Sequence, residues 1–215
     1  MRNSSGQQLL LALALSLVCL LGQAGEGGIV DGHNQHARTG NTFARQVLAL
    51  HNKLIAQTDA TRKTRNGGYA NYPDFYREET WYDANGGLIS RLLWERDNPQ
   101  NLHTIEVFIR DEQGRVLRDY LAAYLPDYRN APTQTQVTLY RYNGELSAFR
   151  GFDAYGDPIV ERCTGRFQGG QVDFVLDENE IYEARVGRSD AMKRPEYQAC
   201  FAGLAETAGD YLTPH

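Results

Sequence analysis

Long hydrophobic runs are scarce in this chain, and the longest one is too short to span a membrane. From Leu9 to Leu21 the residues are apolar except for Ser16, which gives a run of 13 residues. A membrane-spanning helix needs about 20 such residues. No later stretch comes close to that length. We therefore expect no transmembrane segment.

Clusters of basic residues are also missing. The 215 residues include 22 Lys and Arg against 27 Asp and Glu, which gives a formal net charge of −5. Nucleic acids and anionic lipid surfaces are bound through clustered Lys and Arg side chains. An acidic chain without a long basic run therefore predicts no nucleic-acid partner and no anionic membrane partner.

The common signatures of catalytic and cofactor sites are absent. The chain has no Gly-x-Ser-x-Gly, no Cys-x-x-Cys and no glycine-rich loop followed by Lys. The close pair His33 and His36 lies in a polar, Gly-rich segment that offers no supporting shell for a metal. We predict no catalytic residue, no metal and no cofactor. A hydrolase with dispersed catalytic residues stays an alternative, because paired carboxylates leave no local signature.

Residues 1–24 are typical of a secretory signal peptide. Arg2 is the only charged residue before Glu26, and the apolar run follows it. Gly22 and Ala24 are small residues at the two positions that a signal peptidase reads. We expect cleavage after Ala24 and export to the periplasm or the extracellular space.

Cysteine is rare as well, with three residues in the whole chain. Cleavage of the signal peptide removes Cys19 and leaves Cys163 and Cys200, an even number that predicts one disulfide in an oxidising compartment. Closing a loop of 37 residues stabilises a fold by about 3–4 kcal/mol. The alternative is a lipoprotein acylated on Cys19, but Leu17 and Val18 stand where a lipobox has small residues.

The remaining chain is typical of a flexible N-terminal segment, residues 25–40, followed by a single globular domain, residues 41–215. The segment is Gly-rich and polar. Asn41 is then a predicted N-cap of an amphipathic helix over residues 42–58. The apolar positions of this helix recur at intervals of three and four residues: Phe43, Val47, Leu50 and Leu54.

Residues 78–186 have the pattern of a β-meander. Short runs rich in Val, Ile, Leu, Tyr and Phe alternate with turns that contain Asp, Asn and Gly. Asn143-Gly144 is the strongest two-residue hairpin signal, and the last predicted strand covers residues 180–186. Short loops join antiparallel neighbours. We predict a mainly β (α+β) fold, a single antiparallel meander of about eight to nine strands that forms an open sheet or a half-barrel.

One face of this sheet is predicted to be buried beneath helices. Three strands show apolar residues on alternate positions, with Arg150 as an exception in the second: Ile105, Val107 and Ile109; Leu146, Ala148 and Phe152; Val172, Phe174 and Leu176. Pro195 begins a predicted C-terminal helix over residues 195–208. Cys200 lies on its apolar stripe with Tyr197, Phe201 and Leu204, so the disulfide would attach this helix to the sheet.

Two segments resemble the hairpins of YD-repeat and MORN-2-type bacterial surface proteins. They are Tyr82–Ile89 and Phe152–Ile159, and each begins with an aromatic residue followed by Asp and a Gly-containing turn. The turns recur at unequal intervals, whereas a repeat array needs a fixed period. The resemblance is explained by shared turn chemistry and implies no function.

An aromatic stretch after the first helix supplies the candidate binding residues. They are Tyr69, Tyr72, Tyr76, Trp81 and Tyr82. Tyr and Trp combine a large contact area with a polar group, which suits a protein hot spot or the face of a sugar. The alternative is that these rings cover the edge of the sheet as part of the core.

The sequence thus predicts an exported, non-catalytic accessory protein that binds another envelope or extracellular protein. A small-ligand or glycan-binding protein with a barrel-like cavity is the alternative, if the sheet curls.

Overall fold

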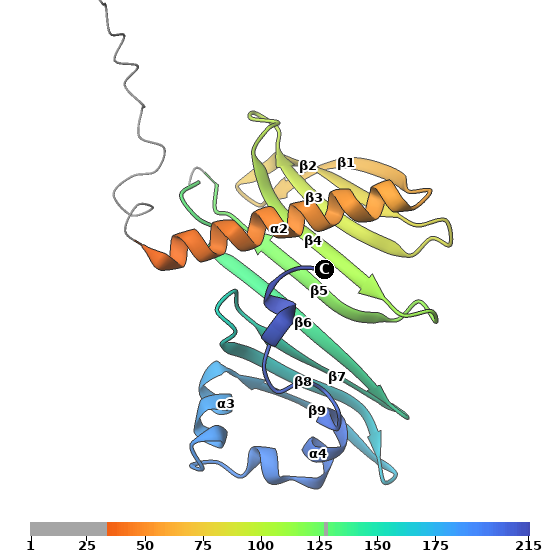
Figure 1. Cartoon of the computed structure of the whole chain (residues 1–215), viewed down its shortest axis with the longest axis vertical. Coiled ribbons are helices and arrows are strands. Elements are labelled where there is room, and N and C mark those ends of the chain that lie inside the picture. Colours follow the sequence, from red (N-terminus) through yellow and green to blue (C-terminus); the bar gives the residue numbers. More distant parts are fainter. Residues whose placement is uncertain (1–33, 127–128) are drawn as a thin grey trace, which may run out of the picture.

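The computed structural model of the chain describes residues 34–126 and 129–215 (Figure 1). The predicted signal peptide, Cys19, His33 and residues 25–33 of the predicted N-terminal segment lie outside the described residues. Within the described part, no helix is both long enough and apolar enough to cross a membrane.

Nine antiparallel strands form one sheet whose spatial order follows the sequence. The strands are β1 (Thr61–Tyr69), β2 (Tyr72–Tyr82), β3 (Leu88–Glu95), β4 (Leu102–Arg110), β5 (Val116–Ala123), β6 (Gln134–Asn143), β7 (Leu146–Phe152), β8 (Pro158–Phe167) and β9 (Gly170–Asp177). β1 and β9 stand at the two ends of this order and do not pair with each other. The predicted meander is confirmed, and the sheet is open rather than closed into a barrel.

The helices lie on one face of the sheet (Figure 1). α2 (Gln35–Gln57) packs across β3 to β6, α3 (Glu178–Arg185) packs on β8 and β9, and α4 (Pro195–Phe201) packs on β6 to β8. Two short 3-10 helices, η1 (Ala191–Lys193) and η2 (Gly209–Leu212), complete the C-terminal part.

Two hydrophobic clusters fill the space beneath the helices. The cluster under α2 includes Phe43, Val47, Ile105, Val107, Tyr120, Val137 and Phe152. The cluster under α3 and α4 includes Leu146, Ala148, Cys163, Ile181, Tyr197 and Phe201. Both clusters take alternate residues of β7, so they occupy the same sheet face. The prediction that helices cover the apolar residues of one sheet face is therefore confirmed.

Three hairpin loops use the same hydrogen bonds, which accounts for the resemblance between the turns. Asp83, Asp111 and Asp153 each begin such a loop. In all three, the carboxylate accepts hydrogen bonds from the backbone N–H groups two and four residues later. The residue three positions after the Asp is Gly with a positive φ, such as +80° at Gly114, a conformation that residues with a Cβ rarely adopt.

Residues 180–186, predicted as a strand, belong instead largely to helix α3. Asp177 opens this segment as the other aspartates open their loops, but Glu180 stands where they have Gly. The Asp177 carboxylate accepts from the Glu180 N–H at 2.9 Å, and the Glu180 carboxylate accepts from the Asp177 N–H at 3.0 Å. This reciprocal capping box starts a helix, which explains why the strand prediction was wrong.

α2 begins at Gln35, seven residues before its predicted start, so residues 35–40 are helical rather than flexible. The true N-cap is Asn34, whose side chain accepts from the backbone N–H of His36 at 2.9 Å. Ala37 and Gly40 extend the buried stripe toward the N-terminus. Asn41, the predicted cap, instead donates from its side-chain amide to the carbonyl of Asn130 at 2.6 Å.

The sheet begins at Thr61 rather than at residue 78. β1 is an edge strand whose residues 61–66 are exposed, so the apolar alternation used to predict strands is missing. It is held by its backbone ladder with β2 and by the ion pair between Arg65 and Glu78, whose charged atoms lie 2.8 Å apart.

α4 ends at Phe201 instead of residue 208. The N–H of Leu204 donates to the carbonyl of Phe201 at 3.0 Å. This turn, which follows the helix, contains Gly203 with a φ of +74°, and glycine is common just after helix C-termini. The chain then crosses to η2, where Leu212 packs on the cluster beneath α2.

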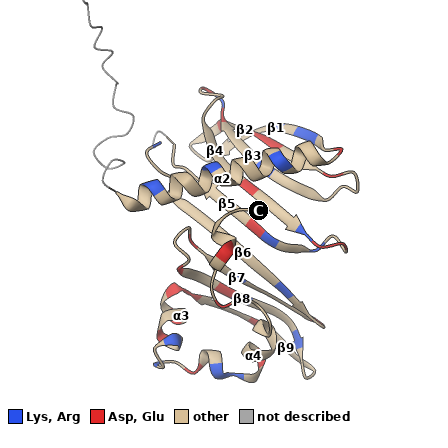
Figure 2. Cartoon of the chain, viewed as in Figure 1, with Lys and Arg blue, Asp and Glu red and all other residues tan. Residues whose placement is uncertain are grey.

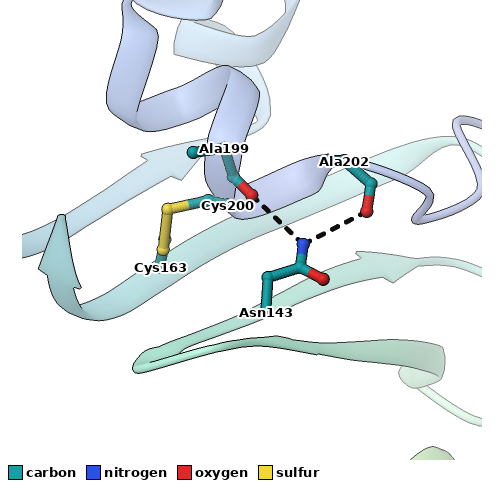
Figure 3. Close-up of a disulfide and its surroundings, with 5 residues drawn as sticks. All are labelled: Asn143, Cys163, Ala199, Cys200 and Ala202. Carbon is teal, nitrogen blue, oxygen red and sulfur yellow. Dashed lines mark hydrogen bonds between the residues drawn. A yellow bond between two sulfur atoms is a disulfide. The ribbon is translucent and has the colours of Figure 1, made fainter. Parts of the chain in front are cut away.

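α4 is attached to the sheet at two adjacent points (Figure 3). The sulfur atoms of Cys163 on β8 and Cys200 on α4 lie at disulfide-bonding distance, with their Cα atoms 6.1 Å apart. The side-chain amide of Asn143 donates to the carbonyls of Ala199 and Ala202 at 3.1 and 3.2 Å (Figure 3). The predicted pairing and its predicted role of joining helix to sheet agree with this geometry.

Candidate functional site

The five predicted aromatic residues do not form one surface. Tyr72 pairs with Tyr69 at one end of the β1–β2 hairpin, and Tyr82 pairs with Thr61 at the other end. Tyr76 lies near the first end, whereas Trp81 lies beside Tyr82. The structure therefore brings Tyr69, Tyr72 and Tyr76 together and separates Trp81 and Tyr82 from them.

At the first end lies a cluster that we call the aromatic tip. It consists of Tyr69, Tyr72, Phe75, Tyr76 and His103. The ring centroid of Tyr69 lies 5.8 Å from that of Phe75, 5.9 Å from that of Tyr76 and 5.8 Å from that of His103. The ring centroid of Phe75 lies 5.0 Å from that of His103 and 6.4 Å from that of Tyr72. His103 comes from β4, two strands beyond β2, so no local pattern could have linked it to the tyrosines.

His103 forms the buried base of the aromatic tip. Its side chain is 4% exposed, and its Nε2 shares a hydrogen bond of 2.5 Å with the Tyr69 hydroxyl. Burial lowers the pKa of His103 and raises the pKa of Tyr69. Both groups are therefore neutral near pH 7, and their hydrogen bond fixes the ring of Tyr69 on the base.

Two glycines let the hairpin close tightly around these rings. A Cβ atom on Gly68 would collide with the backbone carbonyl of Tyr72, and one on Gly67 would lie 2.7 Å from the ring of Tyr76. Gly67-Gly68 in the sequence suggests a break between elements, but the structure uses both residues inside the hairpin for close approach.

The outer rings of the aromatic tip face solvent. Tyr69 is 46% exposed and Tyr72 is 65% exposed. Large aromatic side chains are normally covered by other residues. Tyr69 stays accessible although it is held by three ring contacts and its hydrogen bond to His103, and Tyr72 stays accessible beside Phe75. The tip can therefore offer a partner apolar area and hydroxyl groups with little loss of side-chain freedom.

Trp81 and Tyr82 occupy different surroundings. Trp81 packs against the cluster beneath α2, with its ring centroid 5.7 Å from that of His51. Tyr82 lies under the ammonium group of Lys63, 4.9 Å from the ring centroid. The placement of Trp81 matches the alternative that some of these rings cover the core.

His51 and Ser90 form a buried pair that sequence reasoning missed. His51 Nδ1 lies 2.8 Å from Ser90 Oγ, and the two side chains are 4% and 0% exposed. Burial lowers the pKa of His51, and the charge of Glu79 partly opposes this shift. Because substrate cannot reach the Ser90 hydroxyl, the pair does not supply a working nucleophile.

Residues 34–126 and 129–215 contain no group of three His, Cys, Asp or Glu side chains arranged to hold a metal ion. His33, half of the close histidine pair, lies outside these ranges.

Arg150, the exception on an apolar strand face, belongs to a buried polar network. Its Nε donates to the Glu161 carboxylate at 2.5 Å, and the Tyr197 hydroxyl donates to the same carboxylate at 2.7 Å. Arg150 also donates to the Tyr197 oxygen at 3.1 Å and to the carbonyl of Ala205 at 2.7 Å. The network links β7, β8 and α4, and the disulfide joins two of these elements, β8 and α4.

Asp119 is a buried carboxyl on the sheet face that the helices leave open. Its neighbour Tyr120 is buried in the cluster beneath α2, so Asp119 faces the opposite way. Burial raises the pKa of Asp119 to about 6, although hydrogen bonds from Tyr140 and Thr138 oppose the shift. The Tyr140 hydroxyl donates to the carboxylate at 2.7 Å.

We expect Asp119→Asn to stabilise the protein at pH 7.5 by about 2–3 kcal/mol, because a two-unit pKa difference costs about that much. The pKa of Asp119 is higher in the folded state than in the unfolded state, so the unfolded state loses its proton first as the pH rises. The free energy of unfolding therefore falls between about pH 4 and about pH 6. Urea unfolding at pH 4 and pH 7.5 measures the difference, which should nearly vanish at pH 4. Asp173→Asn is the exposed control, and an equal gain at both pH values would contradict the assignment.

Comparisons with known proteins give little beyond this geometry. No protein-family model matches the chain, and no curated protein matches it. A solved structure of a DUF3836 family protein from Parabacteroides distasonis is similar over 51% of this chain and 95% of its own, with 16% sequence identity and a TM-score of 0.28. A similarity at this level supports no inference about function.

Proposed function

We propose that this chain is an exported, non-catalytic accessory protein that binds another envelope or extracellular protein through its aromatic tip. The supporting observation is the exposure of Tyr69 and Tyr72 beside the half-buried ring of Phe75 and the buried ring of His103. Tyrosines held rigidly at a surface are frequent hot spots of protein interfaces. Export rests on the signal-peptide pattern of residues 1–24.

The distribution of charge is consistent with recognition by aromatic contact. Both signs of charge are spread over the molecule (Figure 2), although α2 and β1 carry Lys and Arg without Asp or Glu. Long-range electrostatic steering needs a surface with a dominant sign. A partner of this protein is therefore expected to bind the tip through apolar and hydrogen-bonding groups.

Partner binding should fail when the outer rings are removed. We expect Tyr69→Ala and Tyr72→Ala each to weaken binding by about 30-fold, the effect of losing a hot spot worth about 2 kcal/mol. A photo-cross-linking residue at position 72 of the full-length protein, expressed in its native host, identifies the partner. Titration of the purified partner then measures the dissociation constants.

Tyr182 provides the matched control. It is 57% exposed but lies on α3, at the other end of the sheet. Tyr182→Ala should leave partner binding unchanged, and a cross-linker at position 182 should not capture the same protein. Equal effects of the Tyr182 and Tyr72 variants would refute a binding role for the tip.

A glycan is the second candidate ligand of the aromatic tip, because the exposed ring of Tyr72 offers a flat surface for a sugar. Oligosaccharides that compete with the cross-linked partner would support it. The sequence also suggested that a glycan or small ligand could bind inside a barrel. The sheet is open, so it does not enclose such a barrel cavity.

A further inference from the structure

A cavity of about 740 Å³ opens between α3, η1, α4 and the segment that follows α4. These elements lie at the end of the molecule formed by β8 and β9 (Figure 1). A volume of this size lies within the range of small-molecule sites. The cavity lies away from the aromatic tip and takes no part in the proposed function.

Apolar side chains form much of the cavity wall. Tyr197 and Phe201 of α4 lie with their ring centroids 4.5 Å apart, and Met192 and Leu204 line the space beside them. Such a wall suits the apolar body of a small organic molecule, with a few polar groups to orient it.

Two guanidinium groups line the same cavity, those of Arg150 and Arg185. Arg150 is 4% exposed, and its two terminal nitrogens donate one described hydrogen bond each, to Ala205 and Tyr197. Each terminal nitrogen carries two hydrogens, so one N–H on each has no partner among the described hydrogen bonds. Arg185 is exposed and donates from one nitrogen to the carbonyl of Glu206 at 3.3 Å.

Most of the charged groups that line the cavity are cations. Glu161, which balances Arg150, is fully buried and is not part of the cavity lining. Of the lining residues, Arg150 and Arg185 are cations and Glu206 is the one acidic residue. Guanidinium groups bind carboxylates with matching geometry, and burial strengthens the interaction.

Two parts of the cavity wall, α4 and the Arg150 side chain, are held in place by contacts within the protein. The Cys163–Cys200 pair and the amide of Asn143 fix α4 on the sheet, and Glu161 fixes the guanidinium of Arg150 at 2.5 Å. Binding to a preformed site avoids much of the cost of ordering. We propose that the cavity binds a small organic carboxylate, with its anionic group on Arg150 and Arg185 and its apolar body against Tyr197 and Phe201.

Titration with phenylacetate, followed by NMR of the 15N-labelled protein, tests this proposal. The backbone amides of Gln198 and Gly203, both in the cavity lining, should shift in a saturable manner. Phenylacetamide has nearly the same shape without the charge. It should bind at least tenfold more weakly, because a hydrogen bond to a charged group is stronger than one between neutral groups.

Variants locate the bound anion. Arg185→Gln should weaken phenylacetate binding about tenfold, and Ala202→Trp should abolish it by filling the cavity. Arg188→Gln is the matched control, because Arg188 is an exposed arginine that pairs with Glu183 outside the cavity. The proposal is overturned if the amide shifts do not saturate, if phenylacetamide binds equally well, or if Arg185→Gln has no more effect than Arg188→Gln.

Discussion

Replacing Arg150 with methionine is expected to lower the free energy of unfolding by about 3–5 kcal/mol, the typical cost of breaking a buried ion pair. The Glu161 carboxylate is fully buried, and without Arg150 it keeps the Tyr197 hydroxyl as its described partner. A buried carboxylate without a compensating cation is strongly unfavourable. Urea unfolding at pH 7.5 measures the loss.

Two further variants separate the ion pair from a general effect of changing an arginine. Arg150→Met combined with Glu161→Gln should recover part of the loss, because the uncompensated charge is gone. Arg162→Met is the matched control on the neighbouring strand. Its pair with Asp173 is exposed, and such pairs contribute less than about 1 kcal/mol. If Arg150→Met costs no more than Arg162→Met, the network does not stabilise the fold.

Removing the disulfide should have the second largest effect. Changing both Cys163 and Cys200 to alanine is expected to cost about 3–4 kcal/mol, because the unfolded chain regains the freedom of a 37-residue loop. Urea unfolding of the wild type with and without reductant should show a similar loss.

The double-alanine variant supplies the control for this measurement, since reductant should not change its stability. Mass spectrometry of the unreduced mature protein should find no free thiol after treatment with an alkylating reagent. Two alkylated cysteines in the folded protein would contradict the assigned pair.

The fold was largely predictable because its main signals are local. Apolar residues alternate with other residues in strands such as β4, and this pattern predicts a strand from a short segment. The dipeptide Asn143-Gly144 likewise predicts a hairpin turn without information from distant residues. Some errors came from overlooked local signals, such as the capping box of Asp177 and Glu180, and others arose where a partner far along the chain decides the outcome. β1 is a strand because β2 pairs with it, and its exposed side chains carry no apolar pattern.

The candidate site was predictable only in part, for the same reason. Tyr69, Tyr72 and Tyr76 are close in sequence, and the tight hairpin keeps them close in space. His103 joins them through the register of β2, β3 and β4, which no single segment specifies. Arg150 did leave a signal, because a lone cation on a buried strand face calls for a buried counter-charge; Glu161 could not be identified as that partner without the register of β7 and β8.

The sequential strand order has a consequence for how the chain folds. Every ladder of the sheet joins strands that are neighbours along the chain, so each pairing closes only a short loop and contact order within the sheet is low. Strands β1 to β7 and helix α2, with most of the cluster beneath that helix, lie before Cys163 in the sequence. The larger part of the core can therefore assemble as the chain emerges, and formation of the disulfide then fixes only the last segment in place.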